Sequence, residues 1–324
     1  MRYSRLPGVV FLLAGTSLSL GAAAPASVEA DSGSAERCVA MANQVFGSDV
    51  KITSATHLDA SAATPRSGPN GFGAQAALPA HCRIEGVVDE RKGAGGKTYE
   101  IKFAIALSDR WSGRFLLQGG GLNGSVGQPV GPVASDGMPA LARGCAVISD
   151  DSGHEGAVFD ASFTADQRAA LDFAEASVLT TAKLGKRITE AYYGEQIAHS
   201  YMTGCSTGGR EGMLASQRYP ELFDGIIVGA PAMRTGDSNL SIEYTQVLLN
   251  QVAPKKADGN PDVAALLTPA VRKTLLDGML AQCDALDGLQ DGMIENVAKC
   301  HFEPQKLVCE SGKTADTKKI VLVR

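Results

Sequence analysis

Four short runs of apolar residues predict buried strands. The first run alternates apolar and polar positions, as a half-buried strand does, and the other three are short apolar stretches. Residues 166–193 place apolar side chains at helical spacing and therefore predict a helix. Strands separated by helical segments predict an α/β fold, with a mostly parallel sheet flanked by helices. The four runs are 99–107, 114–118, 145–150 and 225–229.

A glycine-flanked serine lies where a fifth strand-compatible run, 197–203, meets a helix-compatible run that stops at Pro220. The sequence Gly204–Gly208, GCSTG, fits the G-x-S-x-G motif in the strand–turn–helix context that the motif requires. The serine of such a turn has a strained backbone, so the residues two positions away on either side must lack bulk. Ser206 is therefore a candidate nucleophile, and the backbone N–H of Thr207 is a candidate oxyanion donor. The alternative is a plain turn between a buried strand and a buried helix.

Two glycine-rich stretches imitate nucleotide-binding loops without their context. Residues 119–124, GGGLNG, match G-x-G-x-x-G, but glycines and prolines follow where a helix should begin, which excludes a dinucleotide site. Esterases place a second oxyanion donor in such a loop, so Gly120 and Gly121 are candidates; a flexible turn is the alternative. Residues 93–98, GAGGKT, lack the first glycine and the following helix of a phosphate-binding loop, and predict a hairpin loop.

Composition suggests three parts of the chain. Residues 1–26 predict a signal peptide, because two arginines precede a short apolar run and small residues follow; an uncleaved membrane anchor is the alternative. Residues 31–235 predict the α/β core, with an irregular, Ser-, Ala-, Gly- and Pro-rich segment up to Cys82. Residues 236–324 predict the start of a second domain, with a helix capped by Thr268. We therefore expect a secreted or periplasmic protein, whose seven cysteines are candidates for disulfides.

An acidic loop in the second domain is a candidate metal site. Asp284, Asp287 and Asp291 lie close together among glycines, and hard oxygen ligands on a bending chain suit calcium. The carbonyls of Leu289 and Met293 are candidates to complete the ligand set. The spacing is not that of an EF-hand, and a solvated pair of Asp-Gly turns is the alternative. The net charge of −5 and the lack of a basic stripe exclude nucleic acid as an expected partner.

Several motifs together resemble the tannase and feruloyl esterase family, which also includes hydrolases of the terephthalate monoester released from polyester. The resemblance extends from about Cys38 to Cys309. It implies an α/β-hydrolase core interrupted by a calcium-binding lid, and a serine esterase that cleaves small aromatic esters. The motifs are LGKRITEAYYGEQIAHSYMTGCS and GCSTGGREGMLASQRYPELFDGIIVGAPA, together with QGGGLNG, DSGHEG and the acidic loop between two cysteines.

The family's functional residues map onto matching positions of this chain. Ser206 would attack the ester carbonyl and form an acyl-enzyme, which water then releases as the free acid. Thr207 and a glycine of the 119–121 run would donate the oxyanion-hole amides. In the family, the cysteine that matches Cys205 pairs with a cysteine beside the catalytic histidine. The remaining implied roles are calcium binding by Asp284, Asp287, Asp291 and the carbonyls of Leu289 and Met293, and disulfides Cys38–Cys82 and Cys283–Cys300.

The sequence departs from the family at its end, since the family's catalytic acid and histidine follow the lid and this chain stops at Arg324. We expect an incomplete chain with little esterase activity, and His154 is only a weak substitute for the missing base. Robust hydrolysis of methyl ferulate or methyl gallate by the 324 residues would refute this expectation. Two rival functions remain: an exported module that binds aromatic ligands without catalysis, and an exported peptidase of the same fold. The sequence specifies neither the acyl group, nor the alcohol, nor the oligomeric state.

Overall fold

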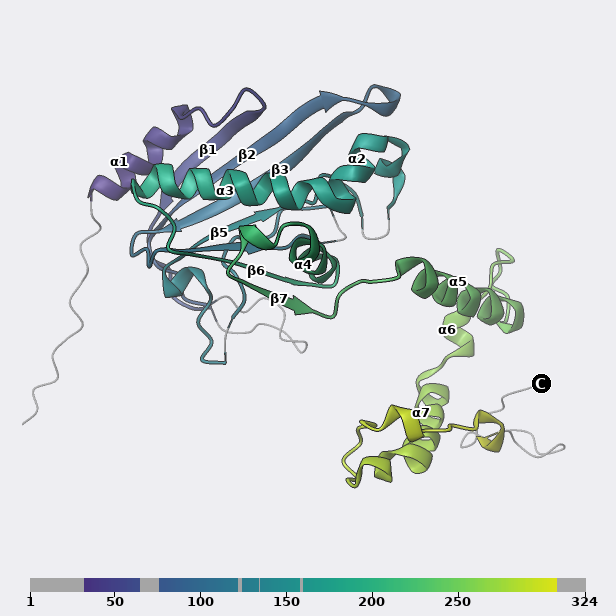
Figure 1. The fold of residues 1–324 in the computed structure, drawn as a ribbon. Coiled ribbons are helices and arrows are strands. Elements are labelled where there is room, and N and C mark those ends of the chain that lie inside the picture. The colour runs from purple at the N-terminus through teal and green to yellow at the C-terminus, as the bar shows by residue number, and fades with distance from the viewer. Residues whose placement is uncertain (1–31, 65–75, 122–123, 134, 158–159, 308–324) are drawn as a thin grey trace, which may run out of the picture. The chain divides into compact units, whose positions relative to one another are not determined.

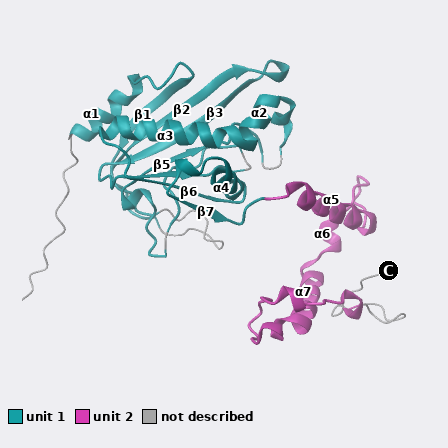
Figure 2. Ribbon diagram, in the orientation of Figure 1, with its two compact units in different colours: residues 1–232 teal, residues 233–324 magenta. Residues whose placement is uncertain are grey.

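The computed structural model describes residues 32–64, 76–121, 124–133, 135–157 and 160–307. The predicted signal peptide, residues 1–26, lies outside the described residues. The chain divides into two compact units, residues 1–232 and residues 233–324 (Figure 2), and each is considered by itself below. Among the described helices, none has the length and apolarity needed to cross a bilayer.

One sheet forms the centre of the first unit (Figure 1). Its described strands lie in the order β1-β2-β3-β5-β4-β6-β7. The β1/β2, β2/β3 and β3/β5 pairs are antiparallel, whereas β4/β5, β4/β6 and β6/β7 are parallel. The strands are β1 (Val50–Leu58), β2 (His81–Lys92), β3 (Thr98–Ser108), β4 (Arg114–Gln118), β5 (Cys145–Asp150), β6 (His199–Cys205) and β7 (Gly225–Gly229).

Helices of the first unit precede and connect these strands, and the second unit is helical in its described part. A π-helical turn, Asp172–Ala176, lies between α2 and α3, so the helix predicted over 166–193 is continuous in the chain but irregular in its hydrogen bonding. The α-helices are α1 (Ser32–Ala40), α2 (Gln167–Leu171), α3 (Ser177–Tyr193), α4 (Thr207–Arg218), α5 (Thr235–Val252), α6 (Val263–Leu266) and α7 (Pro269–Cys283).

Most predicted elements of the core are confirmed. The runs at 114–118, 145–150 and 225–229 coincide with β4, β5 and β7. The stretch at 93–98 joins β2 to β3, and the Gly93 N–H donates to the Lys97 carbonyl at 2.9 Å, as a hairpin loop requires. In the second unit, Thr268 caps α7 by accepting the Val271 N–H at 3.3 Å.

Two expectations are wrong in the N-terminal third. The sheet is mixed rather than mostly parallel, because β1, β2 and β3 form consecutive antiparallel pairs. The segment up to Cys82 is not wholly irregular, since it contains α1 and β1. β1 is an edge strand whose side chains alternate only between partly buried and exposed. Such a strand needs few apolar residues, so its sequence carries little hydrophobic signal.

The two faces of the sheet pack against different parts of the chain. Phe115 and Leu117 of β4 belong to the main core, together with Val178 and Ile188 of α3. Leu116, which points to the opposite face because side chains alternate along a strand, packs in a second cluster with residues of the 130–147 region. The sheet is therefore enclosed by helices on one face and by connecting segments on the other, and the carboxyl ends of β4, β5 and β6 lie at one edge.

The disulfide Cys38–Cys82 is formed, and it connects α1 to β2 with both cysteines buried. A cross-link across a sequence separation of 44 removes enough chain entropy from the unfolded state to stabilise the fold by about 4 kcal/mol in the loop-closure model. The N-terminal segment is thus held covalently to the sheet.

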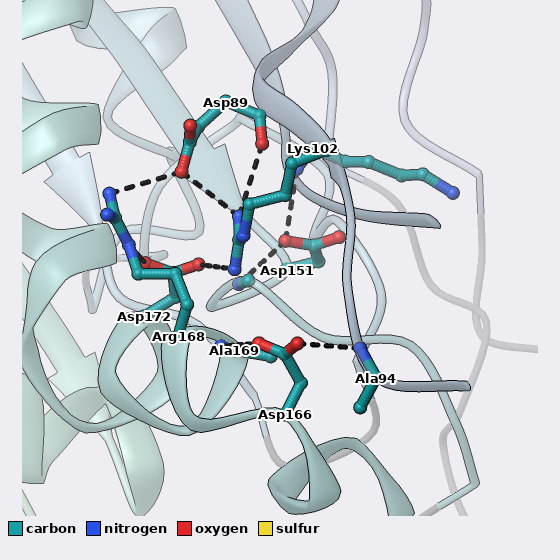
Figure 3. A network of polar contacts seen from close by, with 10 residues as sticks. Asp89, Ala94, Lys102, Asp151, Asp166, Arg168, Ala169 and Asp172 are labelled. Carbon is teal, nitrogen blue, oxygen red and sulfur yellow. Dashed lines mark hydrogen bonds and ion pairs between the residues drawn. The ribbon is translucent and has the colours of Figure 1, made fainter. Parts of the chain in front are cut away.

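A ring of two arginines and two aspartates fixes the end of the β2–β3 hairpin to the π-helical turn (Figure 3). Arg91 donates to Asp172 at 2.6 Å and to Asp89 at 3.0 Å. Arg168 completes the ring, with nitrogens 3.1 Å from Asp89 and 3.3 Å from Asp172. The side chain of Asp172 is almost fully buried, and a buried carboxylate needs partners for its charge. The two arginines supply them.

Candidate active site

Ser206 occupies a strained turn between β6 and α4. Its φ of 58° and ψ of −114° lie outside the regions that non-glycine residues usually adopt, at a cost of about 1–3 kcal/mol. Three backbone hydrogen bonds hold this conformation: the Ser206 N–H donates to Gly229, and the Ser206 carbonyl accepts from Arg210 and Ala232, all at 3.0–3.1 Å. The Ser206 residue is exposed. The tight turn predicted from the glycine-flanked motif is confirmed.

The glycines around Ser206 are required by backbone contacts. A Cβ on Gly204 would lie 2.3 Å from the carbonyl carbon of Gly208, and a Cβ on Gly209 would lie 2.3 Å from the carbonyl oxygen of Gly229. A Cβ on Gly208 would lie 3.0 Å from the carbonyl carbon of Gly119. The turn, the start of α4 and the glycine loop at the end of β4 are therefore in direct backbone contact.

Only part of the glycine loop is free to bind an oxyanion. The N–H of Gly119 donates to the Thr203 carbonyl at 2.8 Å. The N–H of Gly120, which was a candidate donor, already donates to Oε2 of Glu211 at 2.8 Å. The N–H of Gly121 has no hydrogen-bond partner among the described residues, and Gly121 is partly exposed. Gly121 therefore remains the candidate for the second donor, beside Thr207 at the first position of α4.

Sequence reasoning missed a group of buried carboxylates beside the glycine loop. Glu211 of α4 is 2% exposed and Asp150, at the end of β5, is 3% exposed. Burial raises the pKa of Glu211 to about 7, and the charge of Asp150 adds to the rise. Burial also raises the pKa of Asp150, and burial followed by repulsion from Asp150 raises the pKa of Asp151 to about 8. The position of acids after β5 was a visible signal, but nothing local indicated Glu211.

The π-helical turn supports α4 from the side. Arg210 donates to the carbonyls of Phe173 at 2.8 Å and Ala174 at 2.9 Å, and its guanidinium lies 4.7 Å from the centre of the Phe173 ring. At the other end of α4, the Tyr219 hydroxyl donates to Glu175 at 2.7 Å. Two attachments fix the helix that begins at Thr207, and with it the orientation of the preceding turn.

Two described histidines of the first unit, His154 and His199, have other surroundings. His154 is 3% exposed, with its ring 4.4 Å from the ring of Phe163 and 4.9 Å from that of Phe173. This packing favours the interpretation that His154 anchors its loop. His199 lies at the opposite end of β6 from Ser206. The Ser206 hydroxyl forms no hydrogen bond within the described ranges, so these residues do not identify its general base.

The acidic loop of the second unit is closed by the disulfide Cys283–Cys300, as the resemblance implied. Each of its aspartates accepts hydrogen bonds from loop amides: Asp284 from Gly292, Asp287 from Leu289 and Glu295, and Asp291 from Met293. The donor atoms have the chemistry that calcium prefers, but no three acidic, histidine or cysteine side chains converge on a metal position in the described part of the chain. The calcium site therefore stays a prediction.

Two of the remaining cysteines, Cys145 and Cys205, form no disulfide among the described residues. Cys205, beside the candidate nucleophile, is exposed and Cys145 is buried. Cys309 lies outside the described residues. The pairing that the resemblance implies for Cys205 is not tested by these positions.

Residues 82–323 match the family model described as tannase and feruloyl esterase. The chain belongs to the tannase and feruloyl esterase family. It is 37% identical over 262 residues to mono(2-hydroxyethyl) terephthalate hydrolase of Piscinibacter sakaiensis, with 74% of this chain and 43% of that protein aligned. It is 30% identical over 305 residues to a probable feruloyl esterase B of Aspergillus clavatus, covering 92% of this chain and 53% of that protein.

Solved structures of the same family have the same fold. Feruloyl esterase B of Aspergillus oryzae superposes with a TM-score of 0.69 at 26% identity, covering 89% of this chain and 53% of that chain. Tannin acyl hydrolase of Aspergillus niger gives a TM-score of 0.55 at 22% identity. The core is therefore an α/β-hydrolase core built on a mixed sheet. This tannase and feruloyl esterase family member spans about half the length of the relatives that it matches.

Proposed function

We propose that this protein is an exported serine carboxylic-ester hydrolase that cleaves small aromatic esters through an acyl-enzyme on Ser206. The observation that carries the proposal is the strained, exposed position of Ser206 at the N-terminus of α4. The family supports the reaction class, and the aromatic acyl group is inferred from relatives named feruloyl esterase and mono(2-hydroxyethyl) terephthalate hydrolase. Hydroxycinnamate, gallate and terephthalate esters are the substrate classes to test first.

The mechanism follows from the backbone around the serine. The Ser206 hydroxyl attacks the ester carbonyl while a general base takes its proton. The carbonyl oxygen becomes an oxyanion, which the N–H groups of Thr207 and Gly121 stabilise together with the N-terminal dipole of α4. Collapse of the tetrahedral intermediate expels the alcohol and leaves the acyl-enzyme, and water then releases the aromatic acid. A histidine that approaches the exposed side of Ser206 would serve as the base.

Export is proposed from the N-terminal sequence and the disulfides. Residues 1–26 have the pattern of a cleaved signal peptide, and two disulfides persist only in an oxidising compartment. The protein would therefore act in the periplasm or outside the cell, where it would meet esters too large or too polar to enter freely.

A structural calcium ion in the acidic loop is part of the proposal. Asp284, Asp287 and Asp291 would bind it with the carbonyls of Leu289 and Met293, and the ion would relieve repulsion among the carboxylates. At a calcium concentration 100-fold above Kd, we expect a stabilisation of about 2.7 kcal/mol for the second unit. Calorimetric titration of chelator-treated protein with Ca²⁺ measures Kd, and thermal unfolding with and without Ca²⁺ measures the rise in Tm. An Asp287→Asn variant should bind Ca²⁺ more weakly. Lack of any heat or any rise in Tm would remove calcium from the proposal.

Covalent labelling tests the proposed nucleophile. In this chain fused to the C-terminal part of the Aspergillus clavatus relative beyond the aligned region, a fluorophosphonate probe should modify Ser206, and mass spectrometry of proteolytic fragments locates the adduct. Prior incubation with methyl ferulate or methyl gallate should slow labelling if those esters enter the same site. Retention of an aromatic ligand without any labelling of Ser206 would instead support a non-catalytic binding module.

A further inference from the structure

Glu211 connects the nucleophile helix to the glycine loop through a buried carboxylate. Its Oε2 accepts the N–H of Gly120 at 2.8 Å, and its Oε1 accepts the hydroxyl of Ser152 at 2.8 Å. The residue belongs to α4, the helix that begins directly after Ser206. One side chain therefore links three segments: the turn that carries the serine, the loop after β4 and the loop after β5.

Packing around the glycine loop leaves it little room to move. A Cβ on Gly120 would lie 2.0 Å from the Ser152 hydroxyl oxygen and 3.3 Å from an oxygen of Asp150. A Cβ on Gly119 would lie 2.7 Å from Cα of Gly208 and 3.0 Å from Oε2 of Glu211. The loop is thus held between the first turn of α4 on one side and the residues after β5 on the other.

Ser152 is itself fixed in place. Its φ is 56°, in the left-handed region, and its N–H donates to Oδ1 of Asp150 at 3.0 Å. The hydroxyl is buried and donates to Oε1 of Glu211, while the Gly120 N–H donates to Oε2. Each carboxylate oxygen therefore accepts a hydrogen bond from a donor that is already held in position. Charge-assisted hydrogen bonds of this kind are about twice as strong as neutral ones, which makes the carboxylate an effective clamp.

We propose that Glu211 is a positioning residue that clamps the glycine loop and so sets where the Gly121 amide lies relative to Ser206. The effect of the clamp on the reaction rests on the proposed esterase function. The contact between Gly120 and Glu211 does not depend on that function. The clamp gives a role to an acidic side chain that is 2% exposed. An apolar side chain at 211 would leave the N–H of Gly120 and the hydroxyl of Ser152 buried without partners.

The ionisation of Glu211 gives the clamp a spectroscopic signature. The charged groups that act on Glu211 are Asp150 of β5 and Arg210 of its own helix. Since burial raises the pKa of Glu211 to about 7, the carboxylate loses its charge in an accessible pH range. The Gly120 amide then donates to a neutral acid, and its proton resonance should shift because the hydrogen bond weakens.

Amide NMR of the 324-residue chain with ¹⁵N-glycine labelling tests the clamp without any need for activity. We expect the Gly120 resonance of the wild type to include a titration step from Glu211, which Glu211→Gln removes while its amide keeps an acceptor for Gly120; steps from Asp150 and Asp151 would appear in both proteins. Gly120 titration curves that are identical in the wild type and Glu211→Gln would overturn the proposal. Glu221→Gln, an exposed acid in the same unit, is the matched control and should leave the Gly120 titration unchanged.

The rate at which the fluorophosphonate labels Ser206, measured in the same fusion with the C-terminal part of the Aspergillus clavatus relative, tests positioning. Displacing an oxyanion donor by about 1 Å costs on the order of 100-fold in rate, so Glu211→Leu should label that much more slowly. Glu211→Gln should restore labelling to within about threefold of the wild type, a rescue that a purely structural role does not require. Equal labelling of Glu211→Leu and wild type would overturn positioning. If Glu211→Leu does not fold, the comparison of Glu211→Gln with wild type by NMR decides the proposal, and absence of labelling in the wild type counts against the proposed function alone.

Discussion

Replacing Ser206 by alanine is expected to abolish fluorophosphonate labelling and to lower ester hydrolysis by a factor on the order of 10³ or more. The reason is that the strained turn exposes a single hydroxyl at the N-terminus of α4, and alanine removes the atom that forms the acyl bond. Hydrolysis is measured with p-nitrophenyl acetate and methyl ferulate. The measurement uses this chain fused to the C-terminal part of the Aspergillus clavatus feruloyl esterase B that lies beyond the aligned region.

A matched control for this variant lies on the same helix. Ser216→Ala removes another hydroxyl of α4, one that donates only to the Met213 carbonyl at 2.8 Å, and it should keep hydrolysis within about twofold of the parent. A Ser206→Ala variant that retains most of the parent rate would show that the reaction uses another nucleophile.

Replacing Gly204 by alanine is expected to destabilise the first unit by about 3 kcal/mol or more and to abolish labelling of Ser206. The new Cβ would lie 2.3 Å from the carbonyl carbon and 2.4 Å from the carbonyl oxygen of Gly208. Both atoms belong to the backbone at the start of α4, so no side-chain rotation relieves the overlap. Urea unfolding followed by Trp111 fluorescence measures the loss, because this tryptophan stacks on Tyr193 within the same unit.

The comparison for Gly204→Ala is Gly225→Ala, in the neighbouring strand β7. A Cβ there would approach only the ring of Tyr201, at 3.3 Å, and the φ of Gly225 is not positive. Its change in unfolding free energy should stay below about 1 kcal/mol. If Gly204→Ala unfolds at the same urea concentration as Gly225→Ala, the steric account of the turn is wrong.

The part of the site that sequence could predict is the part with a local steric cause. The bend at Ser206 depends on Gly204 and Gly208, which lie four positions apart in the chain. The five-residue motif and its flanking elements were therefore enough to predict the turn. The predicted strand boundaries around it were less accurate. β6 continues to Cys205 and α4 begins at Thr207, because the turn consists of the serine alone.

The missed features depend on contacts between distant residues. Glu211 and Gly120 are separated by 91 positions, and no periodicity reveals that one accepts a hydrogen bond from the other. The direction of each strand relative to its neighbours could not be predicted from the sequence either. The run of β3 reads as a strand in either orientation, and only its pairing with β2 and β5 makes it antiparallel. The edge strand β1 was missed because half-exposed positions tolerate polar residues.

The order of the strands has a consequence for how the polypeptide acquires its structure during synthesis. β4 is paired on one side with β5 and on the other with β6, both of which follow it in the chain. Until residues 145–150 have been added β4 has neither neighbour, and until residues 199–205 follow, one of its edges keeps unpaired backbone N–H and C=O groups open to other nascent chains. The β1–β3 meander, whose partners are sequential, can form first, and its strand β3 then offers an edge to β5, which in turn pairs with β4.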